Sequence, residues 1–244
     1  MLFFERLAPF ARSEQKKRFR VLFHLSIGIA NGIFIYVLMT RPILAALTYT
    51  QSHQAGIIHL CGLKGWVEIA ATVIAFDFWA YWMHRASHHF SLLWRFHSAH
   101  HSDMEIDVTN AVRFHAGELL ISNCFTCLMI LAWGPSLAGL VAYGSFLNIC
   151  SQFHHGNLKI PLGIQDKLEI VMVTPRMHRC HHSLHPDCFN TNFAVFCTWW
   201  DRLFGTYHFA RVPSELRPIG LIEPRGEATM KLRPFLLTPF NHGR

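Results

Sequence analysis

Residues 77–88 read D-F-W-A-Y-W-M-H-R-A-S-H, an apolar run that ends in two histidines four positions apart. At 3.6 residues per helical turn, His84 and His88 lie on one face of a helix, together with Asp77 and Tyr81. Two histidines at this spacing can hold one metal ion or reach two neighbouring ions. A carboxylate on the same face can orient a ligand by accepting its ring N–H, so Asp77 is a candidate supporting residue.

Two further clusters share the pattern H-x-x-H-H: residues 97–101 read H-S-A-H-H, and residues 178–182 read H-R-C-H-H. In a helix this pattern brings three imidazoles to one side. Together with the first pair and a histidine at position 155, these side chains can give each of two metal ions about four nitrogen ligands. Neutral imidazole binds iron, copper, nickel and zinc, so the ligands alone do not identify the metal. The candidate ligands are His84, His88, His97, His100, His101, His155, His178, His181 and His182.

The order D-x-x-x-Y-W-x-H-R-x-x-H, H-x-x-H-H and T-P-x-x-H-x-x-H-H resembles the sterol desaturase and fatty acid hydroxylase superfamily. Residues 107–115 and 200–207 are similar to further segments of that family, so the resemblance covers roughly residues 66–210. It implies an integral-membrane, non-haem di-iron oxygenase that hydroxylates or desaturates a lipid substrate with O₂ and external electrons. The implied cofactor is two iron ions. Zinc can replace iron as an artefactual occupant, because such sites bind zinc more tightly than ferrous iron.

Three residues near the clusters join Asp77 as candidates for supporting the metal ligands: His115, Glu118 and Asn157. His115 is in addition an alternative ligand, because Glu118 follows it by three positions beside the second cluster. The sequence leaves this alternative open.

Two other classes of protein are alternatives to the oxygenase. A membrane metalloprotease needs an H-E-x-x-H motif or an equivalent glutamate base, and the sequence has none. The second alternative is a non-enzymatic membrane protein that binds metal or haem through pairs of histidines. Here the histidines cluster at predicted helix ends and in loops instead of facing one another across a bilayer, which favours the oxygenase. A haem protein would show a Soret absorption band that a di-iron protein lacks.

Composition independently indicates a membrane protein. The chain has 244 residues, of which 51% are hydrophobic and 15% are charged, against about 25% charged in an ordinary soluble domain. The mean hydropathy is +0.22 and the pI is near 9.2, with a net charge of +7. No nucleic-acid-binding motif accompanies this charge, so we expect anionic lipid headgroups and not nucleic acid as its partner.

The seven cysteines are scattered and predict no disulfide framework. Cys124 and Cys127 fall within an apolar helical segment, and we interpret both as small buried hydrophobic residues. This usage indicates a reducing compartment on the catalytic side.

The sequence predicts an all-α integral-membrane protein in three parts. These are a basic cytoplasmic arm (1–20), a membrane-embedded domain (21–210) and a peripheral carboxy-terminal tail (211–244). Two clear transmembrane helices are expected at 21–40 and 66–82. Glu68 and Asp77 fall in the second and require polar partners.

The remaining segments are a loop or interfacial stretch over 41–65, a helical hairpin over 117–153 and an amphipathic helix over 159–173. The hairpin breaks at W-G-P-S, and its arms of about sixteen residues can either cross the bilayer or dip into it. The sequence leaves both options open.

Lysine and arginine residues predict the orientation. Six lie in residues 1–20, three in 83–115 and eleven in 155–244, whereas the opposite side holds only Arg41 and Lys64. The positive-inside rule then predicts a multi-pass protein with both termini and a helical histidine-box region on the cytoplasmic side.

Electrons must come from a separate protein, because the chain has no dinucleotide-binding motif and no ferredoxin-like cysteine spacing. We expect a ferredoxin or a small haem protein with its reductase. Its predicted docking surface is basic and includes Lys16, Lys17, Arg18, Arg176 and Arg179.

Overall fold

The computed structural model describes residues 2–11, 17–188, 190–209, 216, 218–222 and 229–241. This part of the chain is helical and contains isolated β-bridges but no strand of a sheet, which confirms the all-α prediction. The elements are α1 (Leu2–Leu7), α2 (Lys17–His53), α3 (Ile57–Leu60), α4 (Gly65–His89), α5 (Ser91–His101), the 3₁₀ helix η1 (Val108–Val112), α6 (Ala116–Trp133), α7 (Leu137–His154), α8 (Leu162–Leu168), α9 (Pro175–His181), α10 (Trp199–Leu203), α11 (Leu232–Leu236) and α12 (Thr238–Asn241).

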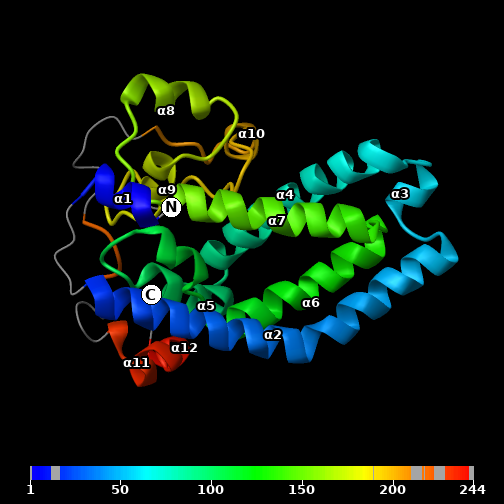
Figure 1. Cartoon of the computed structure of the whole chain (residues 1–244), viewed down its shortest axis with the longest axis horizontal. Coiled ribbons are helices and arrows are strands. Elements are labelled where there is room, and N and C mark those ends of the chain that lie inside the picture. The colour runs from blue at the N-terminus through cyan, green and yellow to red at the C-terminus, as the bar shows by residue number, and fades with distance from the viewer. Residues whose placement is uncertain are drawn as a thin grey trace.

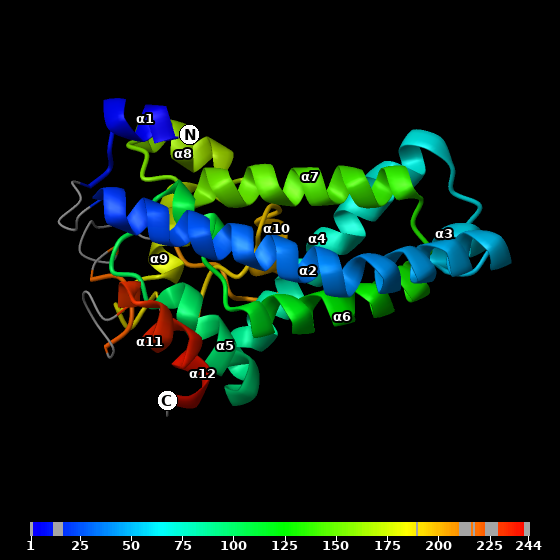
Figure 2. The same cartoon turned by 60° about the horizontal axis from the view of Figure 1, so that its bottom comes forward.

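Four long helices form an elongated bundle with short helices at one end (Figure 1). Helix α2 packs against α6, and α4 packs against α7. The short helices α1, α5 and α8 to α12 gather at the end of the bundle where both marked termini lie, and we call this region the cap. The opposite end holds α3 and the turn between α6 and α7, as both views show (Figures 1 and 2).

The long helices expose apolar faces. Lys17–Leu60 and Ala116–Trp133 are long and apolar enough to cross a membrane, and only 17% and 6% of their most apolar windows are buried inside the protein. A helix in the core of a soluble protein would instead be mostly buried. The predicted span 21–40 therefore lies within a membrane-compatible helix. The predicted span 66–82 is helical, but the more apolar second candidate is α6, because α4 carries Glu68, Asp77 and a charged end.

Two segments differ from the sequence-based expectation. Residues 41–53 continue α2 past Pro42 instead of forming a loop, because Ala46 and Leu47 are buried in a cluster with Phe76 and Ile130. The amphipathic helix expected over 159–173 is reduced to the seven residues of α8.

The predicted hairpin is present as α6 and α7. Gly134 ends α6 in the left-handed conformation (φ 74°), and Ser136 caps α7 by accepting the N–H of Gly139. Glu68 accepts the backbone N–H and the hydroxyl of Ser136 at 3.0 and 2.7 Å, which supplies the polar partner that this buried carboxylate requires. A Cβ on Gly134 would lie 2.3 Å from the carbonyl oxygen of Ala55, so the turn needs glycine to pack this closely.

The amino-terminal segment is attached to the cap. Within the expected basic arm, Arg12 and Lys16 lie outside the described residues. Glu5 of α1 is 1% exposed and accepts the N–H groups of Val108 and Asn157. Arg20 is also 1% exposed, so it belongs to the protein interior and not to a free cationic arm.

The described part of the carboxy-terminal tail also packs on the cap. Phe235 is 2% exposed and forms a cluster with Ile27 and Ala99. The carbonyl of Thr229 accepts a hydrogen bond from the buried Arg113. These contacts join the tail to α2 and α5.

Candidate metal centre

Four elements bring the candidate ligands together where the bundle meets the cap. The last turns of α4 carry the first pair, α5 carries the second cluster, and His155 follows the end of α7. The third cluster lies on α9, where Thr174 accepts the N–H of Met177 as the N-cap and Pro175 occupies the first turn. The sequence T-P thus starts a helix only seven residues long, and that helix lies almost wholly in the interior.

All nine predicted ligands converge, and they separate into two groups. Within each group the potential ligand atoms lie within 4.8 Å of one another. Eight of the nine side chains are buried, and His84 is half-buried. The first group contains His84, His88, His97, His101 and His181, and the second contains His100, His155, His178 and His182.

Backbone carbonyls fix the orientation of four of the rings. The Nδ1 atoms of His84 and His181 lie 2.8 Å from the carbonyl oxygens of Phe193 and Thr191. His100 and His155 make the same contact with Arg113 and Ser151, at 3.2 and 2.7 Å. A carbonyl oxygen can only accept, so each Nδ1 carries the proton and each Nε2 presents a lone pair. This is the tautomer that binds a metal ion through Nε2.

These supporting carbonyls could not be predicted from the sequence, because a backbone group has no side-chain signature. Two of them belong to the loop after the third cluster, which returns toward α9. That return is a tertiary feature and not a local one.

The Nε2 atoms meet at short distances. The Nε2 of His155 lies 3.2 Å from that of His100 and 2.9 Å from that of His178. His178 and His182 approach to 3.1 Å, as do His101 and His181 in the other group. Lone pairs held this close repel one another unless a proton or a metal ion lies between them. The donor set therefore fits a cation that prefers nitrogen ligands.

Burial keeps these imidazoles neutral. It lowers the pKa of His178 and His182 well below the usual value, and neighbouring histidines lower it further. Burial likewise lowers the pKa of His155 to about 4 and that of His181 to about 3. Neutral imidazole is the form that ligates metals, so the cap holds the rings ready for binding near neutral pH.

Of the four candidate supporting residues, Glu118 contacts a ligand ring. Its Oε1 accepts a 2.6 Å hydrogen bond from Nδ1 of His97, which leaves Nε2 of that ring available for a metal ion. Among the described residues, Asp77 hydrogen-bonds no histidine ring. It accepts the N–H groups of Phe196 and Cys197 and the indole N–H of Trp200 at 2.8–3.2 Å. The expectation that Asp77 orients a ring is therefore wrong, because the chain after the third cluster folds back onto it.

His115 and Asn157 have structural contacts. The Nδ1 of His115 accepts the N–H of Gly117 and caps α6, and its Nε2 donates to the carbonyl of Leu236. Both ring nitrogens are used, so the alternative of His115 as a ligand is wrong. Asn157 hydrogen-bonds Ala11 and accepts from Arg179, which ties the amino-terminal segment to the third cluster.

Two residues of the predicted docking surface are buried. Arg176 is 7% exposed and pairs with Glu169 and Asp166, and Arg179 is 3% exposed. Neither can attract a carrier from solution, and Lys16 lies outside the described residues. Arg18 is exposed and Lys17 is half-buried, so they keep the basic character of this end.

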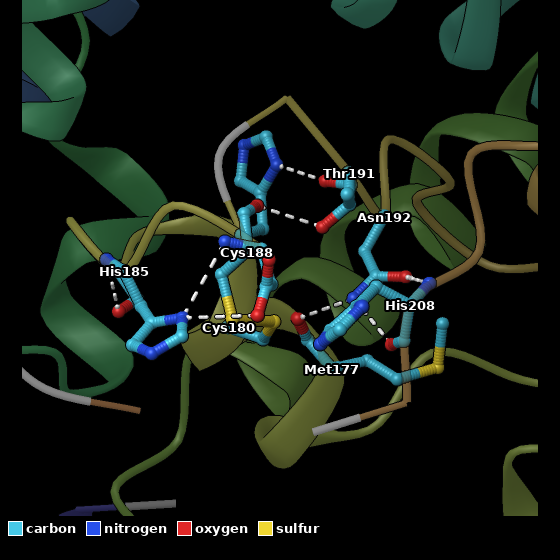
Figure 3. The surroundings of a disulfide bond; sticks show 10 residues. Met177, Cys180, His185, Cys188, Thr191, Asn192 and His208 are labelled. Carbon is cyan, nitrogen blue, oxygen red and sulfur yellow. Dashed lines mark hydrogen bonds and ion pairs between the residues drawn. A yellow bond between two sulfur atoms is a disulfide. The ribbon is translucent and has the colours of Figure 1, made fainter. Parts of the chain in front are cut away.

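A disulfide lies directly beside the third cluster. Cys180, between two candidate ligands, is bonded to Cys188, and both side chains are fully buried. Figure 3 shows Thr191 and Asn192 beside this bond; the hydroxyl of Thr191 donates to the carbonyl of Cys188. The two sulfurs and His208 form a further group of potential ligand atoms, but the sulfurs are already bonded to each other.

The cysteine predictions therefore need correction. One pair is bonded, which the scattered spacing did not indicate. Both sulfurs are fully buried and so are shielded from thiol reductants, which means that this bond does not by itself identify the compartment. Cys124 is exposed and Cys127 is half-buried, because this face of α6 points away from the bundle.

A cavity of about 660 Å³ adjoins the histidines. It is lined at one end by five of the nine candidate ligands and by Glu118, and it continues between the four long helices to Ile43 and Leu140. The metal centre therefore opens into the interior of the bundle.

Comparison with protein-family models matches residues 69–206 to the fatty acid hydroxylase family. The match covers more than half of the chain and includes all nine candidate ligands. No solved structure is similar to this chain.

Several curated proteins are similar to the chain. An alkylglycerol monooxygenase from Xenopus tropicalis is 34% identical over 137 residues, which cover 56% of this chain and 29% of the relative. The ornithine lipid hydroxylase OlsE from Rhizobium tropici is 28% identical over 217 residues, or 86% of this chain and 64% of the relative. A very-long-chain aldehyde decarbonylase from Oryza sativa subsp. indica is 27% identical over 138 residues, or 53% of this chain and 22% of the relative. The chain thus spans less than two thirds of each of these relatives.

Proposed function

The chain belongs to the fatty acid hydroxylase family, and on that premise we propose that it is a membrane-bound, non-haem di-iron oxygenase. It takes a lipid as substrate, O₂ as oxidant and electrons from a separate carrier. The family, the apolar long helices and the histidine groups support membrane association and oxidoreductase chemistry. The number and identity of the metal ions, the substrate and the electron donor are parts of the proposal.

One observation carries this proposal: two groups of buried, neutral histidines whose Nε2 atoms converge. Each group would hold one iron ion, with the nine histidines as ligands. Iron bound there supplies the oxidant, made from O₂, that an unactivated C–H bond requires. Zinc in a purified sample would not contradict the assignment, because imidazole sites bind zinc more tightly than ferrous iron.

The residues of the chain contribute geometry and exclusion of water. Glu118 and the backbone carbonyls hold the rings in the tautomer that binds metal. The cap covers the outer side of the centre, where His178 and His181 are each 2% exposed. The cavity lies on the other side and brings a substrate from the bundle interior to the ligands. A C–H bond can then reach the centre without an open path for water.

The names of the relatives support a lipid substrate and insertion of oxygen. Two of the three are named as a monooxygenase and a hydroxylase, and all three act on lipids or long-chain aldehydes by name. We therefore favour hydroxylation over desaturation for this chain.

We also propose that the protein is multi-pass, with the cap and both termini in the cytoplasm. The cap contains the positively charged segments, in accordance with the positive-inside rule. In this orientation the centre faces the compartment that holds a ferredoxin or a small haem protein with its reductase. The buried Arg176 and Arg179 reduce the predicted basic docking surface but do not remove it.

The test is reconstitution. Protein purified from membranes and loaded with ferrous iron is expected to bind two iron ions per chain. With lipid, a ferredoxin and its reductase, it is expected to consume O₂ and form a hydroxylated lipid. His178→Ala should lose iron and turnover, whereas His53→Ala, at the opposite end of the bundle, should retain both. Wild-type iron content in His178→Ala, or a Soret band in the purified protein, would refute the assignment.

A further inference from the structure

The cavity beside the metal centre is long and narrow. It is lined on α2 from Gly28 to Ile43 and on α7 from His154 back to Leu140. At 1.5 Å per residue, each stretch spans roughly 21–23 Å along its helix. Dividing the cavity volume of about 660 Å³ by this length leaves a mean cross-section of roughly 30 Å². Carbon atoms in contact lie about 4 Å apart, so this section suits a single hydrocarbon chain.

The end of the cavity away from the histidines is closed. Ile43, Leu140 and Tyr143 line it and also pack on the buried cluster around Phe76 and Ile130. The rings of Phe76 and Tyr143 lie 5.1 Å apart between centroids. This apolar floor accommodates a methyl end. A polar headgroup placed there would lose its hydration without gaining partners.

The side of the cavity opens between α2 and α7. Gly32, Gly144 and Asn148 line the cavity and are also exposed on the outer surface. A Cβ on Gly32 or Gly144 would meet no atom within 4 Å, so the two glycines leave a gap in the wall. The surrounding surface carries exposed apolar residues such as Ile33 and Val141, which suit a lipid environment.

From these features we propose that a single hydrocarbon chain of a membrane lipid enters sideways between α2 and α7 and lies with its methyl end on the floor at Leu140 and Tyr143. The cavity is longer than one bilayer leaflet, whose hydrocarbon half-thickness is about 15 Å, so it takes a full-length chain. The headgroup stays at the cap end, and the carbon beside the histidines is one close to the headgroup. The inference rests on the proposed oxygenase function and adds to it the route by which the chain enters, its orientation in the cavity and the position of oxidation.

Two photoactivatable fatty acids test this orientation in the full-length protein in lipid nanodiscs. One carries a diazirine at the methyl end, and the other carries it next to the carboxyl group. The methyl-end probe is expected to label Ile43, Leu140 or Tyr143, and the carboxyl-end probe is expected to label residues near His154. The opposite pattern, or no labelling of the cavity by either probe, would overturn the proposal.

A variant of the wall provides the second test. Gly144→Leu adds a side chain at a position that lines the cavity, and Gly163→Leu makes the same change at an exposed site on α8. A Cβ at either position meets no atom within 4 Å. Labelling of the floor residues should fall about tenfold in Gly144→Leu, because a hydrophobic pocket that no longer accommodates about one methylene group binds roughly tenfold more weakly. The yield of labelling with shorter fatty acids should fall less in Gly144→Leu. Gly163→Leu should give the same labelling as the wild type. Equal labelling in both variants would contradict a chain that passes Gly144.

These tests require neither iron nor turnover. Protein that fails to bind iron but gives the expected labels would refute the proposed oxygenase and keep the lipid site. Protein that turns over but oxidises lipids near the methyl end would refute the orientation and keep the oxygenase.

Discussion

Removing the carboxylate behind His97 should weaken one of the two metal sites and spare the other. The Glu118–His97 contact is short (2.6 Å), and both side chains are largely buried, at 12% and 4% exposure. A partner of this kind usually accounts for 10–100-fold in metal affinity, or about 1.4–2.8 kcal/mol. Glu118→Gln retains an acceptor oxygen, so its loss of metal affinity should be near the lower limit. Glu118→Leu removes it and should approach the upper limit.

The measurement is competition for cobalt(II) against a chromophoric chelator. His97 belongs to the first group only, so both variants should lose affinity for one ion while the second ion binds as in the wild type. Glu68→Gln is the matched control, because Glu68 is a buried carboxylate at the far end of the bundle that hydrogen-bonds Thr72 and Ser136. Two wild-type affinities in Glu118→Leu would refute this role, as would equal weakening of both ions or an equal loss in Glu68→Gln.

Three further predictions concern the cap and its stability. Arg20→Met leaves Asp103 and Asp107 buried without their cation. It should therefore lower the free energy of unfolding, measured in denaturant titrations, by about 3–5 kcal/mol. Arg18 is exposed, so Arg18→Met should change this free energy by less than about 0.5 kcal/mol. Burial lowers the pKa of His155 to about 4, so as pH falls below about 6.5 the unfolded chain takes up a proton first. The metal-free protein should therefore lose stability between pH 6.5 and about 4, and a flat profile would contradict a buried neutral ring. Thiol titration of the denatured protein should count five free cysteines before reduction and seven after it, and seven at the outset would exclude the disulfide.

The sequence predicted those features of the centre that depend on local spacing. The four-residue and three-residue spacings of the histidines place them on helix faces, and all nine residues converge as their pattern indicated. The predicted hairpin is also present, because the turn sequence after Trp133 contains a glycine that suits the left-handed conformation. Which residues serve as ligands stays a prediction until metal is bound.

What the sequence could not predict depends on contacts between distant segments. Asp77 has the spacing of a supporting residue, but the chain near Cys197 folds back onto it and uses both carboxylate oxygens. Glu118 is among the predicted supporting residues, but the ring that it contacts could not be predicted, because Glu118 and His97 are 21 residues apart. Arg20 looked like one more cation of a basic arm, because its partners, such as Asp103, are more than eighty residues away.

The division of the nine histidines into two groups follows from how the two H-x-x-H-H clusters face each other. At about 100° per residue, the last histidine of the motif is rotated by about 40° from the first around the helix axis. The middle histidine is rotated from the first in the opposite direction. On α5 the outer pair, His97 and His101, faces the first group, and His100 faces the second.

On α9 this assignment is reversed. The outer pair, His178 and His182, faces the second group, and His181 reaches the first. Each cluster therefore contributes to both sites, and the two helices cross-link them. A shift of α5 or α9 would disturb both groups at once, so the separation between the two sites is fixed by the same packing that forms each of them. A helix carrying ligands for one group alone, such as α4, does not provide this coupling, which explains why the motif with three histidines occurs on two facing helices.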